Sequence, residues 1–258
     1  MTYQQAALLG LVQGLTEFLP VSSSGHLILV PYVASWPDQG LAFDAAMHLG
    51  TLVALLAYFR RELAALISGT LSRRVGLLVL VASVPALALG WLLDRWLEAN
   101  LRSPLVIAIA NAFWALVMWV ADRRATRSRA PEAPLESIGW RRGLAIGCAQ
   151  ALALIPGTSR SGITITAALF GGLDRATAAR FAFLLGIPAT AAAGGYKTLH
   201  LLAGGLPTGG GQLAVAMGAA CLSGWIAVWF LVTYLRRRTL LPFVLYRLVL
   251  AAVIFAVL

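Results

Sequence analysis

The stretch Pro156-Gly-Thr-Ser-Arg-Ser-Gly162 interrupts an apolar segment, residues 143–173, that is long enough to enter a lipid bilayer. A second stretch, Pro20-Val-Ser-Ser-Ser-Gly25, interrupts residues 1–33 in the same way. Proline followed by small polar residues breaks a helix, and broken helices at membrane depth are tolerated only where they are buried in protein or line a wet cavity. The two interruptions therefore indicate where a membrane protein keeps its polar chemistry.

The composition agrees with a membrane environment. The chain is 60% hydrophobic and 12% charged, whereas a soluble domain has about 25% charged residues. The net charge of +10 would suit a nucleic-acid partner, but the arginines fall in short gaps between apolar runs, as in the cytoplasmic loops of membrane proteins. We therefore expect membrane lipids, and no nucleic acid, as partners.

Apolar runs predict the spanning helices. A transmembrane helix needs about 20 mostly apolar residues. Six stretches meet this requirement: 41–59, 75–93, 104–121, 181–203, 212–235 and 240–258. The sequence therefore predicts an all-α polytopic membrane protein with six transmembrane helices.

Loop charges set the orientation, because Lys and Arg accumulate on the cytoplasmic side. With the arginine-rich loops inside, segment 1–33 starts and ends outside, and segment 143–173 starts and ends inside, so both are predicted to be re-entrant helical hairpins. Residues 1–121 then form a first repeat, 122–142 a cytoplasmic linker and 143–258 a second, inverted repeat. The sequences of the two hairpins match weakly from Gln13 and Gln150, with a one-residue gap before the proline.

Glu17 is the first candidate functional residue. An ionised carboxylate at the centre of a membrane segment costs about 3 kcal/mol, so it usually has a function; the alternative is that it reaches the membrane interface. Gln13 lies four residues earlier, on the same helical face. Together, Gln13 and Glu17 offer oxygen ligands for a metal ion or a proton acceptor.

His26 follows Ser22, Ser23, Ser24 and Gly25 at the break in the first hairpin. Hydroxyl groups, backbone N–H groups and an imidazole in one short segment suit nucleophilic or acid–base chemistry at a phosphate. The alternatives are that His26 is a structural hydrogen-bonding residue and that a serine only caps a helix.

The second hairpin carries an anion-binding pattern. Around Arg160, the small residues Gly157, Thr158, Ser159 and Ser161 let backbone N–H groups point inward, and the guanidinium offers two donors to phosphate oxygens. We expect Arg160 to pair with Glu17 in the resting protein and with a ligand phosphate in the working one. The segment is not a Walker A loop, so ATP is not indicated.

Asp44 and His48 share a helical face. They either support the polar site from behind or form a hydrogen-bonded pair at the membrane interface.

Three motifs together carry a family resemblance: Gln13-x-x-x-Glu17, Ser22-Ser-Ser-Gly-His26 and Pro156-Gly-Thr-Ser-Arg-Ser-Gly-Ile-Thr164. They closely resemble the bacitracin-resistance (BacA) family of undecaprenyl-diphosphate phosphatases, over essentially the whole chain. The resemblance implies removal of the terminal phosphate from undecaprenyl diphosphate, which recycles the lipid carrier of peptidoglycan synthesis. It also implies the bacterial inner membrane, with the active site facing the periplasm.

The resemblance also implies roles for residues. Arg160, Ser159, Thr164 and the N–H groups of both turns would hold the phosphates. Ser23 is the favoured nucleophile, with His26 or Glu17 taking its proton; a water activated by Glu17 is the alternative. The acidic motif of the family is Glu or Gln, three residues, then Glu, so Gln13 implies that Mg²⁺ or Ca²⁺ is held weakly or with help from the diphosphate.

A secondary transporter or lipid flippase is the rival hypothesis, because inverted repeats with broken helices are also a transporter plan. The joint presence of a nucleophile, a base and an arginine for phosphate favours the enzyme. The sequence leaves a homodimer open.

Overall fold

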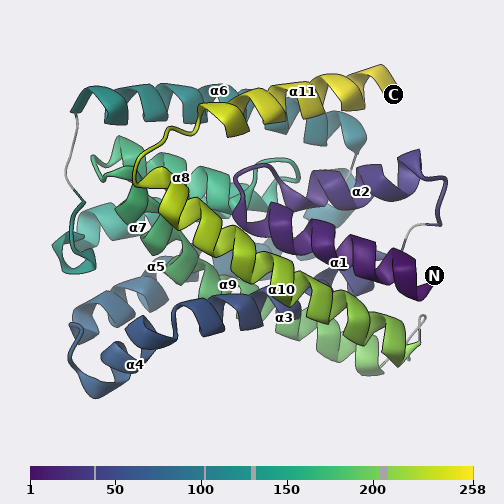
Figure 1. Ribbon diagram of the computed structural model, residues 1–258, viewed down its shortest axis with the longest axis horizontal. Helices are drawn as coiled ribbons and strands as arrows, with labels where there is room; N and C mark the ends of the chain where they lie inside the picture. The colour runs from purple at the N-terminus through teal and green to yellow at the C-terminus, as the bar shows by residue number, and fades with distance from the viewer. Residues whose placement is uncertain (38, 102, 129–131, 204–208, 258) are drawn as a thin grey trace.

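The computed structural model describes residues 1–258 except 38, 102, 129–131, 204–208 and 258, and its regular elements are all helices (Figure 1). The first half contains α1 (Tyr3–Phe18), α2 (Ser23–Val33), α3 (Leu41–Tyr58), α4 (Arg60–Ser68), α5 (Arg73–Asn100) and α6 (Pro104–Ser128). The second half contains η1 (Leu135–Ser137), α7 (Trp140–Gln150), η2 (Ala151–Leu154), α8 (Arg160–Phe170), α9 (Arg175–Ala203), α10 (Gly210–Leu235) and α11 (Leu241–Val257).

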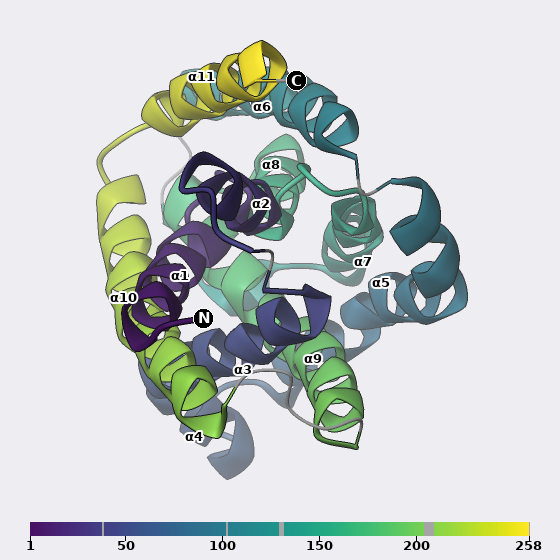
Figure 2. The same cartoon turned by 90° about the vertical axis from the view of Figure 1, so that its right-hand side faces the viewer.

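Two helix pairs enter the molecule from opposite ends. In Figure 1, α1 runs inward from the right-hand end and α2 returns to that end, whereas α7 runs inward from the left and α8 returns there. Helices α3, α5, α6, α9, α10 and α11 run between the two ends and surround the two pairs (Figure 2).

Four of the six predicted spans are confirmed by length and apolar composition among the described residues: Arg73–Leu93, Pro104–Thr126, Arg175–Gly195 and Gly210–Leu235. The other two predicted spans form shorter apolar helices, Phe43–Tyr58 and Leu241–Ala256. The chain is thus an all-helical integral membrane protein.

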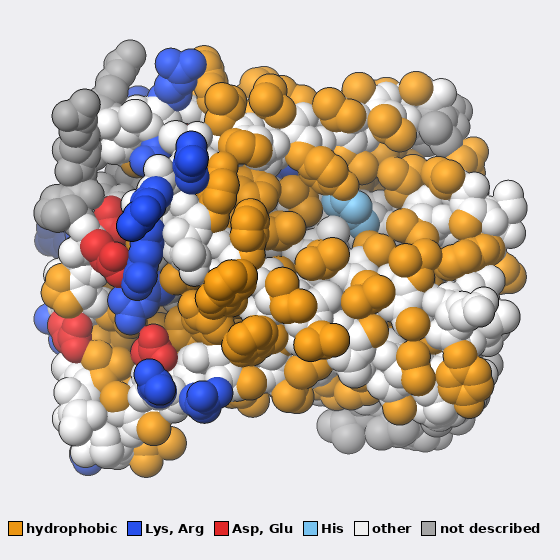
Figure 3. All heavy atoms as spheres, viewed as in Figure 1, with side chains coloured by type: hydrophobic (Ala, Val, Ile, Leu, Met, Phe, Trp, Pro, Cys, Tyr) orange, Lys and Arg blue, Asp and Glu red, His pale blue; other side chains and the backbone are white. Residues whose placement is uncertain are grey.

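The outer surface of these helices fits lipid. On α10, Leu222 is 62% exposed and Trp229 51% exposed, and less than half of its apolar window is buried inside the molecule. Apolar side chains form a broad band in Figure 3, and the Lys, Arg and acidic side chains visible in that view gather at its left-hand end. Such a large apolar surface would be unstable in water, which excludes a soluble protein.

Two glycines fix the position of α1. A Cβ on Gly10 would lie 2.2 Å from the Ala216 carbonyl oxygen, and one on Gly14 would lie 2.1 Å from Ser223 Oγ. Small residues of this kind let membrane helices approach closely. This close packing of α1 on α10 places the last turn of α1, which contains Glu17, in the middle of the molecule.

The region predicted as a linker, 122–142, is partly helical. Helix α6 continues to Ser128, and Asp122 near its end pairs with Arg175, whose Nε lies 2.5 Å from Asp122 Oδ1. Leu135 and Ile138 are buried, so this segment also packs against the helices. Residues 129–131 lie outside the described part of the chain.

Candidate active site

The ends of the two helix pairs meet in the middle of the molecule. The Gly157 N–H donates to Ser24 Oγ at 3.4 Å, and Ser161 Oγ donates to the Leu19 carbonyl at 3.3 Å. Each pair therefore contributes one serine that bonds to the backbone of the other. The two interrupted stretches that the sequence singled out form one site.

The two tips have the same local structure. Ser22 is the N-cap of α2 with φ +72°, and Ser159 is the N-cap of α8 with φ +70°. Non-glycine residues rarely adopt this left-handed conformation, and such strain is often found at functional sites. Ser22 follows Gln13 by as many residues as Ser159 follows Gln150, so the structural match has no gap, unlike the sequence match.

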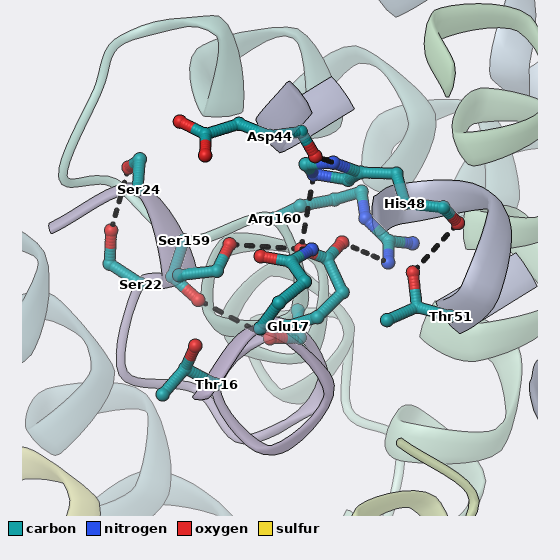
Figure 4. Close-up of polar contacts among 12 residues, drawn as sticks. Thr16, Glu17, Ser22, Ser24, Asp44, His48, Thr51, Ser159 and Arg160 are labelled. Carbon is teal, nitrogen blue, oxygen red and sulfur yellow. Dashed lines mark hydrogen bonds and ion pairs between the residues drawn. The ribbon is translucent and has the colours of Figure 1, made fainter. Parts of the chain in front are cut away.

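Glu17 is buried and its carboxylate is the centre of the polar contacts (Figure 4). Its Oε1 accepts a hydrogen bond from Arg160 Nη2 at 2.9 Å. Its Oε2 accepts from Ser23 Oγ at 2.9 Å and from Gln13 Nε2 at 3.2 Å. The expected resting pair of Glu17 with Arg160 is therefore present, and the candidate nucleophile Ser23 lies against the same carboxylate.

His48 approaches Glu17 from α3. Its Nε2 lies 3.4 Å from Glu17 Oε2, and its Nδ1 donates to the Asp44 carbonyl at 2.8 Å (Figure 4). The Asp44 carboxylate instead accepts from Gln39 Nε2 at 2.6 Å. Of the two arrangements left open by the sequence, support of the polar site is the one observed for His48.

His26 is buried but turned away from this carboxylate. Its Nδ1 donates to the Ser22 carbonyl at 2.8 Å, and its Nε2 is 2.6 Å from the Tyr246 hydroxyl, whose ring stacks on it. With Nδ1 as the donor, the neutral ring accepts from Tyr246. Neither nitrogen bonds to Ser23 or Glu17 among the described contacts.

The remaining candidates for substrate binding line the two tips. Ser22 Oγ is 3.2 Å from Ser24 Oγ, and Ser159 Oγ is 3.3 Å from Ser161 Oγ. Thr164 lies one turn into α8, where its hydroxyl donates to the Arg160 carbonyl at 2.7 Å.

Two glycines at the tips face α6. A Cβ on Gly25 would lie 3.4 Å from Ile107 Cγ2, whereas one on Gly157 would lie 2.5 Å from the Ile107 carbonyl oxygen. Thr158, next to Gly157, is fully buried, and its hydroxyl has no partner among the described residues. Only glycine fits at position 157, where the tip lies against α6.

Sequence reasoning missed Arg247, which lies on α11 next to Tyr246. Its side chain is completely buried, and its Nη2 donates to the Gly157 carbonyl at 2.9 Å and the Thr158 carbonyl at 3.0 Å. The signal was available: a single arginine inside the apolar stretch 240–258 occupies an energetically costly position.

The arrangement combines a hydroxyl group next to a carboxylate with an arginine and two helix N-termini. The N-termini of α2 and α8 carry partial positive charge, which favours an anion at the tips. A hydroxyl 2.9 Å from a carboxylate can lose its proton to it. The site can therefore carry out transfer of an anionic group to an oxygen nucleophile.

Comparison with known proteins agrees with this chemistry. The sequence model of a family described as "Bacitracin resistance protein BacA" matches residues 6–253. A protein named undecaprenyl-diphosphatase from Alcanivorax borkumensis is 46% identical, over 97% of each chain. Another from Teredinibacter turnerae is 44% identical over 96% of each chain, and undecaprenyl-diphosphatase 2 from Stutzerimonas stutzeri is 45% identical over 97% of this chain and 96% of its own.

Proposed function

The chain belongs to the bacitracin resistance protein BacA family, and from this premise we propose that it is an integral membrane undecaprenyl-diphosphatase. It hydrolyses undecaprenyl diphosphate to undecaprenyl phosphate and phosphate. This reaction returns the lipid carrier to peptidoglycan synthesis, and the family name links it to bacitracin resistance. The observation that carries the proposal is the contact of Ser23 and Arg160 with the two oxygens of one buried carboxylate, Glu17.

Ser23 is the proposed nucleophile and Glu17 its base. As Ser23 Oγ attacks the terminal phosphorus, its proton passes to Glu17 Oε2, 2.9 Å away. The bond from that phosphorus to the bridging oxygen breaks, and undecaprenyl phosphate leaves with the oxygen. Water then attacks the phosphoserine, the bond from phosphorus to the serine oxygen breaks as Glu17 returns the proton to that oxygen, and phosphate leaves with the oxygen and both protons of water. His26 is the less supported base, because both of its nitrogens are bonded elsewhere.

Arg160 is the proposed phosphate clamp. Its Nη1 has no partner among the described residues, so the guanidinium has donor capacity beyond its bond to Glu17. When the substrate binds, its phosphate oxygens would replace the Glu17 carboxylate as the partner of Arg160. The positive charge of Arg160 would then lie where the transferred group develops negative charge. The same exchange leaves Glu17 with one fewer donor and makes it a stronger base.

A resident Mg²⁺ or Ca²⁺ does not fit the resting site. A carboxylate has about four acceptor positions, and Gln13, Ser23, His48 and Arg160 already surround Glu17. The amide oxygen of Gln13 is the one unpartnered oxygen beside it, and the described residues contain no cluster of three His, Cys, Asp or Glu side chains suited to a metal. The two residues expected as metal ligands, Gln13 and Glu17, thus bond to each other.

For the membrane topology we propose six spanning helices and two re-entrant hairpins, with residues 1–121 and 143–258 as inverted repeats and 122–142 as a cytoplasmic linker. The exposed Arg236, Arg237 and Arg238 lie in the loop between α10 and α11 and support a cytoplasmic location for that end. The hairpin α1–α2 opens to the other end, which supports an active site facing the periplasm of the inner membrane.

Phosphate release from undecaprenyl diphosphate by the purified protein tests the function. Wild type is expected to release one phosphate per lipid, and Glu17→Gln and Arg160→Met to lose about 10²-fold or more in kcat/KM, because each removes charge from the reacting group. A well-folded wild type that releases no phosphate would exclude the enzyme and favour a lipid transporter. If Arg160→Met is as active as wild type, the proposed role of Arg160 in holding phosphate is excluded, but the phosphatase function is not.

A further inference from the structure

Arg247 is a buried cation without a counter-ion. It is 0% exposed, and among the described residues no carboxylate lies within ion-pair distance of it. Two carbonyl groups accept from its Nη2, but its Nε and Nη1 have no partner in the part of the chain that the structure describes. Buried charges in proteins are paired with an opposite charge or bound to an ion, because the desolvation of an isolated charge is costly. The position therefore calls for an anion.

The unpartnered side of this guanidinium is turned toward the first turn of α8. A Cβ added to Gly162 would lie 2.9 Å from Arg247 Nη1 and 3.2 Å from Ser159 Oγ, so the guanidinium packs directly against this turn, next to the Ser159 hydroxyl. Glycine at position 162 allows this close approach of Arg247 Nη1 to the helix. The first turn of α8 also contributes the positive end of its dipole, which adds to the attraction for an anion.

Arg160 is the first residue of α8, and Arg247 contacts the first turn of the same helix. Arg160 lies against Gly186 of α9 and bonds to Glu17 of α1, whereas Arg247 comes from α11. The resting protein thus pairs one arginine with its own carboxylate and leaves the other without an anion. A diphosphate has two charged groups, and two arginines at the start of one helix match that number.

We propose that Arg247 and the first turn of α8 form a second anion subsite that binds one phosphate group of the diphosphate, while Arg160 binds the other. The inference rests on the proposed function. Arg247 also orients the tip, because its bonds to the carbonyls of Gly157 and Thr158 turn the peptide N–H groups of Thr158 and Ser159 away from α11.

Binding of inorganic pyrophosphate to the purified full-length protein, measured by calorimetry, tests the subsite independently of catalysis. Arg247→Met is expected to weaken binding about 10-fold to 100-fold, as for loss of a charge-assisted hydrogen bond. Arg247→Lys keeps the charge and should lose less. Arg175→Met is the matched control, because Arg175 is a largely buried arginine that is already paired with Asp122; the pyrophosphate affinity of this variant should equal that of wild type.

A second variant and the melting temperature separate binding from folding. Gly162→Ala keeps Arg247 but adds a methyl group that would lie 2.9 Å from its Nη1 and would push the guanidinium away from this turn, so it should also weaken pyrophosphate binding. If Arg247→Met and Gly162→Ala bind pyrophosphate like wild type while the melting temperature falls, Arg247 only ties the tip to α11 and the proposal is overturned. If wild type binds pyrophosphate but hydrolyses no lipid diphosphate, and Arg247→Met still weakens pyrophosphate binding, the subsite stands and only the enzyme is excluded.

Discussion

Arg160 Nη2 lies 2.9 Å from Glu17 Oε1, although the two residues are 143 positions apart in the chain. The contact joins the two interrupted hairpins through one ion pair in the middle of the molecule. In the proposed mechanism a substrate phosphate competes with Glu17 for this arginine, so the pair would connect binding of the diphosphate to the basicity of the carboxylate that faces Ser23.

Ser23→Ala tests the nucleophile. Removing an attacking hydroxyl should lower kcat by about 10³-fold or more. Ser24→Ala should cost less than about tenfold, because the contacts of Ser24 Oγ are long, 3.4 Å to the Gly157 nitrogen and 3.2 Å to Ser22 Oγ, and neither involves Glu17. Rapid quenching followed by mass spectrometry should detect phosphate on the peptide that contains Ser23. A Ser23→Ala enzyme within tenfold of wild type would instead identify water as the nucleophile.

Gln13→Glu tests our inference that the resting site does not hold a metal ion. The change places a second carboxylate four residues from Glu17 on one helical face, which should lower the Kd for Mn²⁺ by about tenfold or more, measured by paramagnetic resonance. Gln150→Glu is the matched control, since Gln150 is the equivalent buried residue of the second hairpin and has Leu154 where the first has Glu17. Equally tight Mn²⁺ binding by wild type and Gln13→Glu would mean that the resting site does hold an ion.

Gly157→Ala tests the fit of the second tip against α6. Position 157 has φ +91°, and a Cβ there would lie 2.5 Å from the Ile107 carbonyl oxygen, so alanine should lower both the melting temperature and phosphatase activity. Gly172→Ala provides the control, because Gly172 has a similar φ of +81° but a Cβ added there would have no neighbouring atom within 4 Å. We expect Gly172→Ala to cost only backbone strain, about 1 kcal/mol, with activity retained. Equal effects of the two changes would show that contact with α6 is unimportant.

Cysteine labelling tests the membrane orientation. In a Cys148→Ala, Cys221→Ala background, Ser35→Cys should react with an impermeant reagent added to intact cells with a permeable outer membrane. Glu136→Cys, in the proposed linker, should react only after the inner membrane is opened. Both side chains are exposed, so access to the reagent depends on the side of the membrane. The opposite pattern would invert the proposed orientation.

The sequence by itself determined the class of protein and the location of its chemistry. Apolar runs, arginine-rich gaps and proline breaks are local features, so they predicted the helices and the two interrupted stretches without any knowledge of packing. The resemblance in motifs then identified the family that the comparisons confirm. Gln13, Glu17, Ser23 and Arg160 were named from the sequence and do lie together.

Only the tertiary structure decided which side chains reach Glu17. His26 is close to Ser23 in the chain, yet the turn at Ser22 and the stacking of Tyr246 direct its ring elsewhere, whereas His48, from another helix, contacts the carboxylate. Arg247 is an ordinary arginine in an apolar stretch until α11 packs against the second tip. These contacts join segments far apart in the chain and depend on how helices pack, which local hydropathy and spacing do not encode.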